Sequence, residues 1–131
     1  MDIDVSTQQA RVPVTVMKLT GRLDATSHEQ LRAAAEKEIK GGARQLLLDF
    51  SAVDYMSSAG IRTINQIFDM LRPHTMSSDQ ALEKGLRDGS YKSPNLKLAN
   101  AKPAVYESLK MVGIDMFIEI HKDLASALAA F

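Results

Sequence analysis

Strand-like and helix-like segments alternate along this chain of 131 residues, which restricts the folds open to it. Residues 46–50 form an apolar run, Leu-Leu-Leu-Asp-Phe, typical of a strand buried on both faces of a sheet. Residues 58–71 then show the spacing of a helix with one buried side, and Pro73 follows its end. That side consists of Ile61, Ile64, Ile67, Phe68 and Leu71. A strand followed by a helix is the repeating unit of an α/β fold.

The same pattern recurs on both sides of this unit. Strands are predicted at residues 3–6, 12–18, 96–99 and 116–120, and a loop at residues 51–56. One helix is predicted from an N-cap at Thr26 or Ser27 to Gly41-Gly42. A second is predicted from Pro103 to Gly113, with Val105, Leu109 and Val112 facing inward. A third is predicted at residues 124–131. We therefore expect an α/β protein with a mixed sheet of about four to five strands flanked by about four to five helices.

Residues 74–93 do not follow this alternation. They contain a short helical pattern at residues 79–86 between polar and glycine-containing ends. We interpret them as a surface insertion in a single domain that spans residues 1–131, because this length fits one domain of common size. Two roles are open for the insertion: it tunes the choice of partner, or it is a tolerated loop extension.

Composition excludes several functional classes. The 16 Lys and Arg residues are balanced by 16 Asp and Glu residues, and this interspersed charge argues against nucleic-acid binding, which needs a basic face. Without cysteine the chain has no disulfide, no thiolate metal site and no cysteine nucleophile. No apolar stretch approaches the roughly 20 residues of a transmembrane helix, so we expect a cytoplasmic protein without direct membrane insertion.

Two adjacent serines, Ser57 and Ser58, stand at the predicted start of the helix at residues 58–71. In one interpretation a serine hydroxyl caps this helix, which is worth about 1 kcal/mol. In the other, the hydroxyl is presented to solvent, and a phosphate attached to it meets free backbone N–H groups and the positive end of the helix dipole. The residues alone leave both interpretations open.

A second candidate site is the turn that contains Asp24 and Thr26. Both residue types commonly stabilise turns or cap helices. If the strand before this turn pairs with the strand at residues 46–50, Asp24 and Ser58 lie at the same edge of the sheet. A carboxylate beside a serine either orients the hydroxyl or binds a metal, and the spacing alone does not choose between them.

Sequence signals of catalysis are missing. His28, His74 and His121 lack metal-ligand spacing, and the chain has neither a Gly-x-Ser-x-Gly nucleophile motif nor a glycine-rich loop that would cradle phosphates. We therefore expect no enzymatic activity, no cofactor and no metal site.

Three parts of the chain together carry a family pattern: residues 19–25 (Leu-Thr-Gly-Arg-Leu-Asp-Ala), the long segment 46–62, and residues 101–109 with the Val-Gly-Ile at 112–114. This pattern resembles the STAS family, named for sulphate transporters and anti-sigma factor antagonists. The resemblance covers almost the whole chain except residues 74–93. It implies the STAS-like fold of an anti-sigma factor antagonist and a function in protein binding rather than catalysis.

The resemblance also implies a mechanism. In family members that regulate transcription, the unphosphorylated domain binds an anti-sigma factor that is also a serine kinase of the GHKL type, and so frees the sigma factor. The kinase then phosphorylates the serine at the start of the second helix and the complex dissociates; a serine phosphatase is the other implied partner. Carried over by motif, the acceptor is Ser58, with Ser57 as the alternative. The implied partner-binding residues are Asp24, Ala25, Thr26, Ser57, Ser58, Ala59, Gly60 and Arg62.

Two positions depart from the family pattern. Ser57 stands where many relatives have Asp, and Ala59 stands where they have Ser or Thr. Ser58 remains the acceptor, and the two changes affect which kinase fits. A second implied function is that of a soluble accessory subunit of a membrane lipid-transport or other transporter assembly, because the same family supplies such domains.

Overall fold

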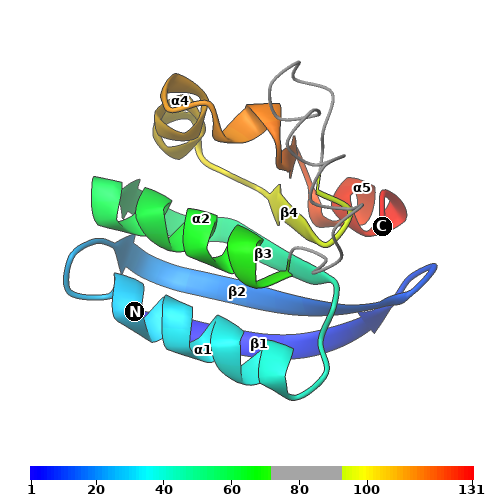
Figure 1. Ribbon diagram of the computed structural model, residues 1–131. Coiled ribbons are helices and arrows are strands. Elements are labelled where there is room, and N and C mark those ends of the chain that lie inside the picture. The colour runs from blue at the N-terminus through cyan, green and yellow to red at the C-terminus, as the bar shows by residue number, and fades with distance from the viewer. Residues whose placement is uncertain (72–92) are drawn as a thin grey trace.

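The computed structural model describes residues 1–71 and 93–131 (Figure 1). Within these residues, five strands form one sheet, which α-helices and one 3₁₀ helix accompany. The strands are β1 (Asp2–Gln9), β2 (Pro13–Leu23), β3 (Leu46–Met56), β4 (Leu96–Ala99) and β5 (Glu119–His121). The helices are α1 (His28–Lys40), α2 (Ser58–Leu71), α4 (Pro103–Met111), η1 (Ile114–Met116) and α5 (Leu124–Ala129). The predicted α/β fold is confirmed.

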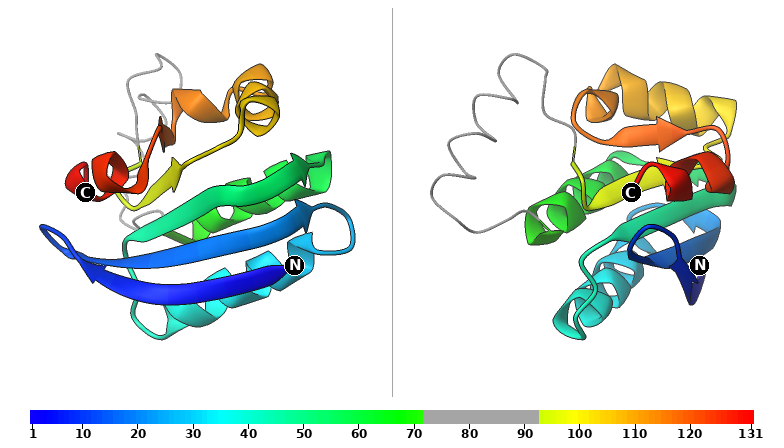
Figure 2. Two further views of the ribbon diagram at one scale, coloured as in Figure 1. Left: turned by 180° about the vertical axis from the view of Figure 1, so that it is seen from behind. Right: turned by 90° about the vertical axis from the view of Figure 1, so that its right-hand side faces the viewer.

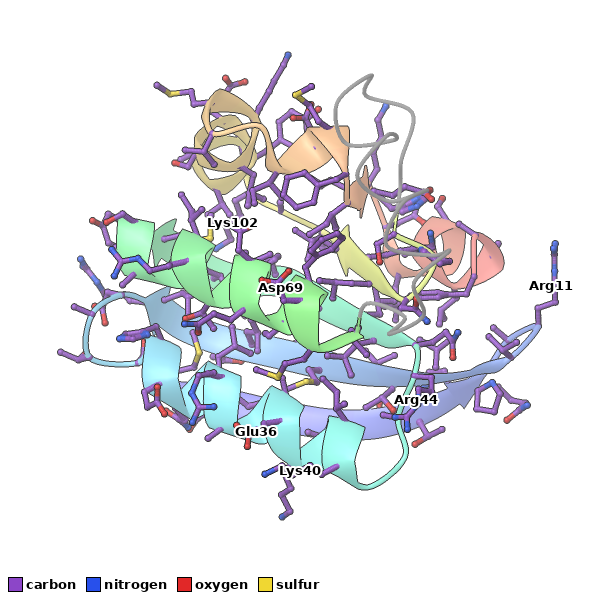
Figure 3. The ribbon with its side chains drawn as sticks, viewed as in Figure 1. Arg11, Glu36, Lys40, Arg44, Asp69 and Lys102 are labelled. Atoms are coloured by element: carbon purple, nitrogen blue, oxygen red, sulfur yellow. The ribbon has the colours of Figure 1, made fainter. Side chains whose placement is uncertain are left out.

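The sheet is mixed because β1 and β2 form a hairpin, whereas helices separate the later strands along the chain. The strand order is β1-β2-β3-β4-β5, with β1 antiparallel to β2 and all other pairs parallel. Helices α1 and α2 cover one face, and α5 lies behind the sheet on the other (Figures 1 and 2). We call these the helical face and the rear face. Arg11 projects from the hairpin tip, at the end of the sheet opposite to the loops that follow β2 and β3 (Figure 3).

The larger core fills the space between the sheet and the helices α1, α2 and α4. Every second residue of the run at 46–50 points into it, and the whole run is buried, as predicted for a central strand. Fully buried members of this core include Met17, Leu31, Leu48, Phe50, Ile64, Ile67 and Leu109. On the rear face, Leu47 joins a smaller cluster with Val14, Val16, Ala99 and Ala127 of α5. Helix α5 therefore has a core of its own.

Several element boundaries differ from the sequence prediction. Strand β2 continues to Leu23, and β3 includes residues 51–56, which were predicted as a loop, because this segment pairs with the end of β2. Residues 116–118 are not part of a strand: η1 occupies Ile114–Met116, and β5 begins at Glu119. Val112 was predicted to face inward but is 55% exposed, because it follows the last turn of α4.

Helix α2 has the bounds that the sequence predicted, and the helix predicted after Thr26 or Ser27 is α1, with Ser27 at its N-cap. The predicted helix at residues 79–86 and the rest of the predicted insertion up to residue 92 lie outside the described residues.

Candidate functional site

The loops that follow β2 and β3 lie side by side at one end of the sheet. The two strands pair up to their last residues, Leu23 and Met56, and the Ser57 N–H donates a hydrogen bond to the Leu23 carbonyl over 2.9 Å. Asp24 and Ser58 follow directly, so the expected placement of both at one edge of the sheet is confirmed. The strands thus fix the relative position of the two loops.

The Asp24 carboxylate organises the turn after β2. Its Oδ1 accepts hydrogen bonds from the Thr26 hydroxyl (2.7 Å) and the Thr26 N–H (3.0 Å). These bonds favour the ionised form and lower the pKa of Asp24. The Ser27 hydroxyl accepts from the Asp24 N–H (3.0 Å) and donates to the Arg22 carbonyl (2.6 Å), and it does not cap α1. Asp24 therefore serves as a turn residue, and the turn presents Ala25 and Thr26 to solvent.

Arg22 adds a cation–π contact to this end of the sheet. Its guanidinium carbon lies 4.6 Å from the centroid of the Tyr55 ring, and its Nε lies 3.7 Å from Asp24 Oδ2. Tyr55 is 45% exposed. Sequence reasoning did not identify this pair as part of the site, because only the register between β2 and β3 brings the two side chains together.

Ser57 and Ser58 differ in their surroundings. Ser58 is the first residue of α2 and is exposed to solvent. Ser57 precedes the helix, and its carbonyl accepts from the Ile61 N–H over 3.1 Å. Its hydroxyl is buried and has no hydrogen-bond partner among the described residues. The Ser57 side chain thus does not cap α2. Of the two hydroxyls, that of Ser58 is the one open to an enzyme.

Gly60 allows the start of α2 to lie directly on the ends of β2 and β3. A Cβ at this position would lie 2.7 Å from Leu23 Cγ and 2.9 Å from Met56 Cγ, closer than side-chain carbons approach one another. Gly60 is itself buried, so it acts on the site by permitting this approach. Sequence reasoning predicted it as a contact residue, and the structure shows its packing role.

A hydrogen-bond chain joins α1 to the first turn of α2. The buried Thr63 hydroxyl donates to the Ala59 carbonyl over 3.1 Å, and His28 Nδ1 lies 3.2 Å from the same hydroxyl oxygen. The sequence pattern tested His28 only for metal-ligand spacing and gave no signal for Thr63, because the two residues are 35 positions apart in the chain. The pair fixes the beginning of α1 against the beginning of α2.

A third loop, between β4 and α4, is held to β3 by an ion pair. Lys102 Nζ lies 2.5 Å from Asp54 Oδ1, and both side chains are largely exposed. The hydrogen bond from Lys102 lowers the pKa of Asp54. Three loops at the carboxyl ends of parallel strands are thus connected, an arrangement common in α/β binding sites.

The described part of the chain contains no group of three or more His, Asp or Glu side chains that could hold a metal ion. His121 Nε2 lies 3.0 Å from Glu119 Oε1, on β5, and His74 is outside the described residues. Among residues 1–71 and 93–131, no helix is long and apolar enough to cross a membrane.

Comparison with known protein families gives a match to the STAS domain over residues 5–78. This chain belongs to the STAS domain family. The match includes both Asp24 and the segment from Ser57 to Arg62. The two main loops of the site therefore lie in the part of the chain that carries the STAS match.

Relatives of this STAS chain bear the names of anti-sigma factor antagonists. A protein of Bordetella bronchiseptica named "Putative anti-sigma factor antagonist BtrV" is 26% identical over 113 residues, which are 86% of this chain and 82% of the relative. An anti-sigma factor antagonist from Mycobacterium paratuberculosis has a similar structure, with a TM-score of 0.71 at 18% identity over 98% of this chain and 93% of that one. Phosphorylated SpoIIAA of Bacillus gives a TM-score of 0.60 at 16% identity, with 96% of each chain covered. The structural likeness supports the fold.

Proposed function

We propose that this STAS chain is an anti-sigma factor antagonist whose binding to its anti-sigma factor is controlled by phosphorylation of Ser58. The observation that carries this proposal is the position of Ser58, an exposed hydroxyl at the first residue of α2, beside the turn built by Asp24. The names of the relatives support the class of partner. The proposed role is protein binding rather than catalysis.

The proposed binding surface is the end of the sheet where the three loops meet. It presents Ala25 and Thr26 from the first loop, and Ser58 and Arg62 from the start of α2, all of them exposed. Asp24, Ser57 and Ala59 are partly exposed, and buried Gly60 supports them. The partner is an anti-sigma factor that is also a serine kinase of the GHKL type, and a serine phosphatase returns the chain to its binding state.

The fold tolerates a phosphate on Ser58. A phosphate adds about −1.5 to −2 charges at neutral pH. The first turn of α2 contains no acidic side chain that would repel it. The free N–H groups and the dipole at a helix N-terminus stabilise a nearby anion by about 0.3–1 kcal/mol. Phosphorylation is therefore expected to leave the structure of the isolated chain almost unchanged.

The same phosphate opposes binding when the surface is covered by a partner. An uncompensated charge that is buried at an interface costs on the order of 3–5 kcal/mol. Because each 1.4 kcal/mol is about tenfold in affinity, phosphorylation is expected to weaken the complex by roughly 100- to 3000-fold. The switch works by masking a surface.

Substitutions at Ser58 test this proposal against an anti-sigma factor from the same organism. Ser58→Ala keeps the surface neutral and should bind like the parent, whereas Ser58→Asp should bind at least about tenfold more weakly. Ser6→Asp, an equal change on exposed β1, is the matched control and should leave the affinity unchanged. Equal binding by the parent, Ser58→Ala and Ser58→Asp would refute the proposal.

Incubation with the kinase identifies the acceptor. The parent and Ser57→Ala should both incorporate phosphate, because the Ser57 hydroxyl is buried, and Ser58→Ala should not. Phosphate mapped to Ser57 would contradict the proposal, because Ser58 would then not be the acceptor.

A further inference from the structure

The solvent-facing side of α2 carries a row of polar residues that begins at Ser58. Successive residues of an α-helix are rotated by about 100°, so Ser58 and Arg62 lie on neighbouring turns of one side of the helix. Both are exposed, as are Gln66 and Asp69 further along the same side. Arg62 is therefore the cationic side chain that follows the proposed phosphate acceptor by one turn.

The direction of the side chains favours contact between these two positions. In an α-helix every Cα–Cβ bond tilts toward the N-terminus, so a long side chain at position i+4 lies over the residue at position i. An acidic group that precedes a basic group by four residues is also the more favourable order, because it agrees with the helix dipole. A phosphate at Ser58 and the guanidinium of Arg62 satisfy both conditions.

Arg62 is available for such a contact. Some other cations are already paired, such as Arg32 with Glu29 and Glu36, and Lys102 with Asp54. Within residues 1–71 and 93–131, Arg62 forms no ion pair. The unphosphorylated chain thus presents a free guanidinium, whose planar donor pattern matches phosphate oxygens.

We propose that Arg62 is the internal counter-charge that binds the phosphate on Ser58. The inference rests on the proposed phosphorylation of Ser58 and adds the residue that receives the modified side chain. Part of the added charge is then neutralised within α2 itself, and the guanidinium is withdrawn from the surface offered to the partner. Phosphorylation thereby changes two neighbouring side chains of the binding surface at once.

The test measures the ionisation of the phosphate and needs neither kinase nor partner. Full-length protein with phosphoserine incorporated at position 58 is compared with its Arg62→Gln and Arg62→Lys variants by ³¹P NMR between about pH 4 and 8. The second pKa of a phosphoserine lies near 6. A nearby cation favours the dianion, so Arg62→Gln should raise this pKa by about 0.3 pH units, and Arg62→Lys should restore part of the difference.

Lys37→Gln is the matched control, because it removes one exposed positive charge from the neighbouring helix α1. It should shift the phosphate pKa by less than about 0.1 pH units. Equal phosphate pKa values in the parent and Arg62→Gln, or an equal shift in Lys37→Gln, would overturn the proposal. If instead Arg62→Gln shifts the phosphate pKa while the substitutions at Ser58 leave anti-sigma factor binding unchanged, the proposed function fails. The pairing then stands as a physical property of the helix.

Discussion

Among the described residues, two groups of charged side chains differ in burial: one at the loop end of the sheet and one on the rear face under α5. At the loop end, the side chains of Arg22, Asp54 and Lys102 are exposed; Arg22 contacts Asp24 in the adjoining turn, and Lys102 pairs with Asp54 at the end of β3. On the rear face, Lys97 is only 2% exposed; its Nζ lies 2.7 Å from Glu119 Oε2 and 5.1 Å from the centroid of the Phe131 ring. The charges at the loop end face water, whereas on the rear face the Lys97 ammonium is buried beside a partly exposed carboxylate.

The difference in burial assigns the two groups different tasks. A buried ammonium loses its hydration and depends on its carboxylate partner, so the Lys97–Glu119 pair is expected to matter for folding. Burial raises the pKa of Glu119, but the contacts with Lys97 and His121 lower it by more, so the carboxylate stays ionised beside Lys97. Exposed charges contribute little to stability and remain available for a partner. Substitutions of charges on the rear face should therefore lower stability, and substitutions of exposed charges at the loop end should instead affect partner binding.

Removing the carboxylate on the rear face should give the largest loss of stability. Glu119→Ala leaves the Lys97 ammonium buried without its partner, and the free energy of unfolding should fall by about 2–3 kcal/mol, below the value for a fully buried pair because Glu119 is partly exposed. Chemical denaturation measures this change. The affinity of the folded variant for the anti-sigma factor should stay within about twofold of the parent.

Glu107→Ala is the control for this substitution, because Glu107 is an exposed carboxylate on α4. It should change stability by less than about 0.5 kcal/mol. The claim that the rear face serves folding and the loop end serves binding would be contradicted if Glu119→Ala weakened partner binding by more than tenfold while the protein remained folded.

A substitution at the loop end should affect both partner binding and folding. Gly60→Ala places a methyl group against Leu23 and Met56, and overpacking costs about 1–3 kcal/mol, of which the better helix propensity of alanine offsets about 1. The net loss of stability should be about 1 kcal/mol. Because α2 must move away from β2, the affinity for the anti-sigma factor should also fall.

Gly41→Ala is the matched substitution, since its Cβ meets only the helix carbonyls at 3.4 Å and its backbone φ is −77°. It should leave both stability and affinity near those of the parent. A Gly60→Ala variant that binds the partner with unchanged affinity would show that the close approach of α2 is not required at the site.

The smallest expected effect is the pH dependence of the contribution that Asp24 makes to stability. The pKa of Asp24 is lowered in the folded state, so its contribution to stability is present above the unfolded pKa near 3.8 and is lost as the pH falls through the lower folded value. Asp24→Asn lacks this contribution at every pH. The difference in Tm between the parent and Asp24→Asn should therefore shrink as the pH is lowered from about 6 to about 2. A difference that stays constant over this range would contradict the role of the ionised carboxylate.

The sequence pattern predicted the elements whose signal is local and missed contacts that depend on register. The apolar run at residues 46–50 and the one-sided apolar spacing of α2 identified the central strand and the helix that begins at Ser58. Residues 51–56 mix polar and apolar side chains, and their pairing with β2 makes them part of a strand. The contact between Arg22 and Tyr55 likewise depends on the alignment of two strands.

Other features were missed because of three-dimensional packing. Lys97 is a charged residue in a strand whose neighbours are apolar, and nothing in its spacing indicates that Phe131 and Glu119 cover it. Gly60 was predicted to contact the partner, whereas its short distance to Leu23 follows only from the placement of α2 on the sheet. Motif spacing indicated the position of the site, and tertiary structure supplied its support.

The central claim is that the loop end of the sheet is a binding surface controlled at Ser58. The most direct measurement is calorimetric titration of the purified anti-sigma factor with the unmodified protein and with protein carrying phosphoserine at position 58. The unmodified protein should bind, and the phosphorylated form should bind roughly 100- to 3000-fold more weakly with an unchanged fold. Equal dissociation constants for the two forms would contradict the account.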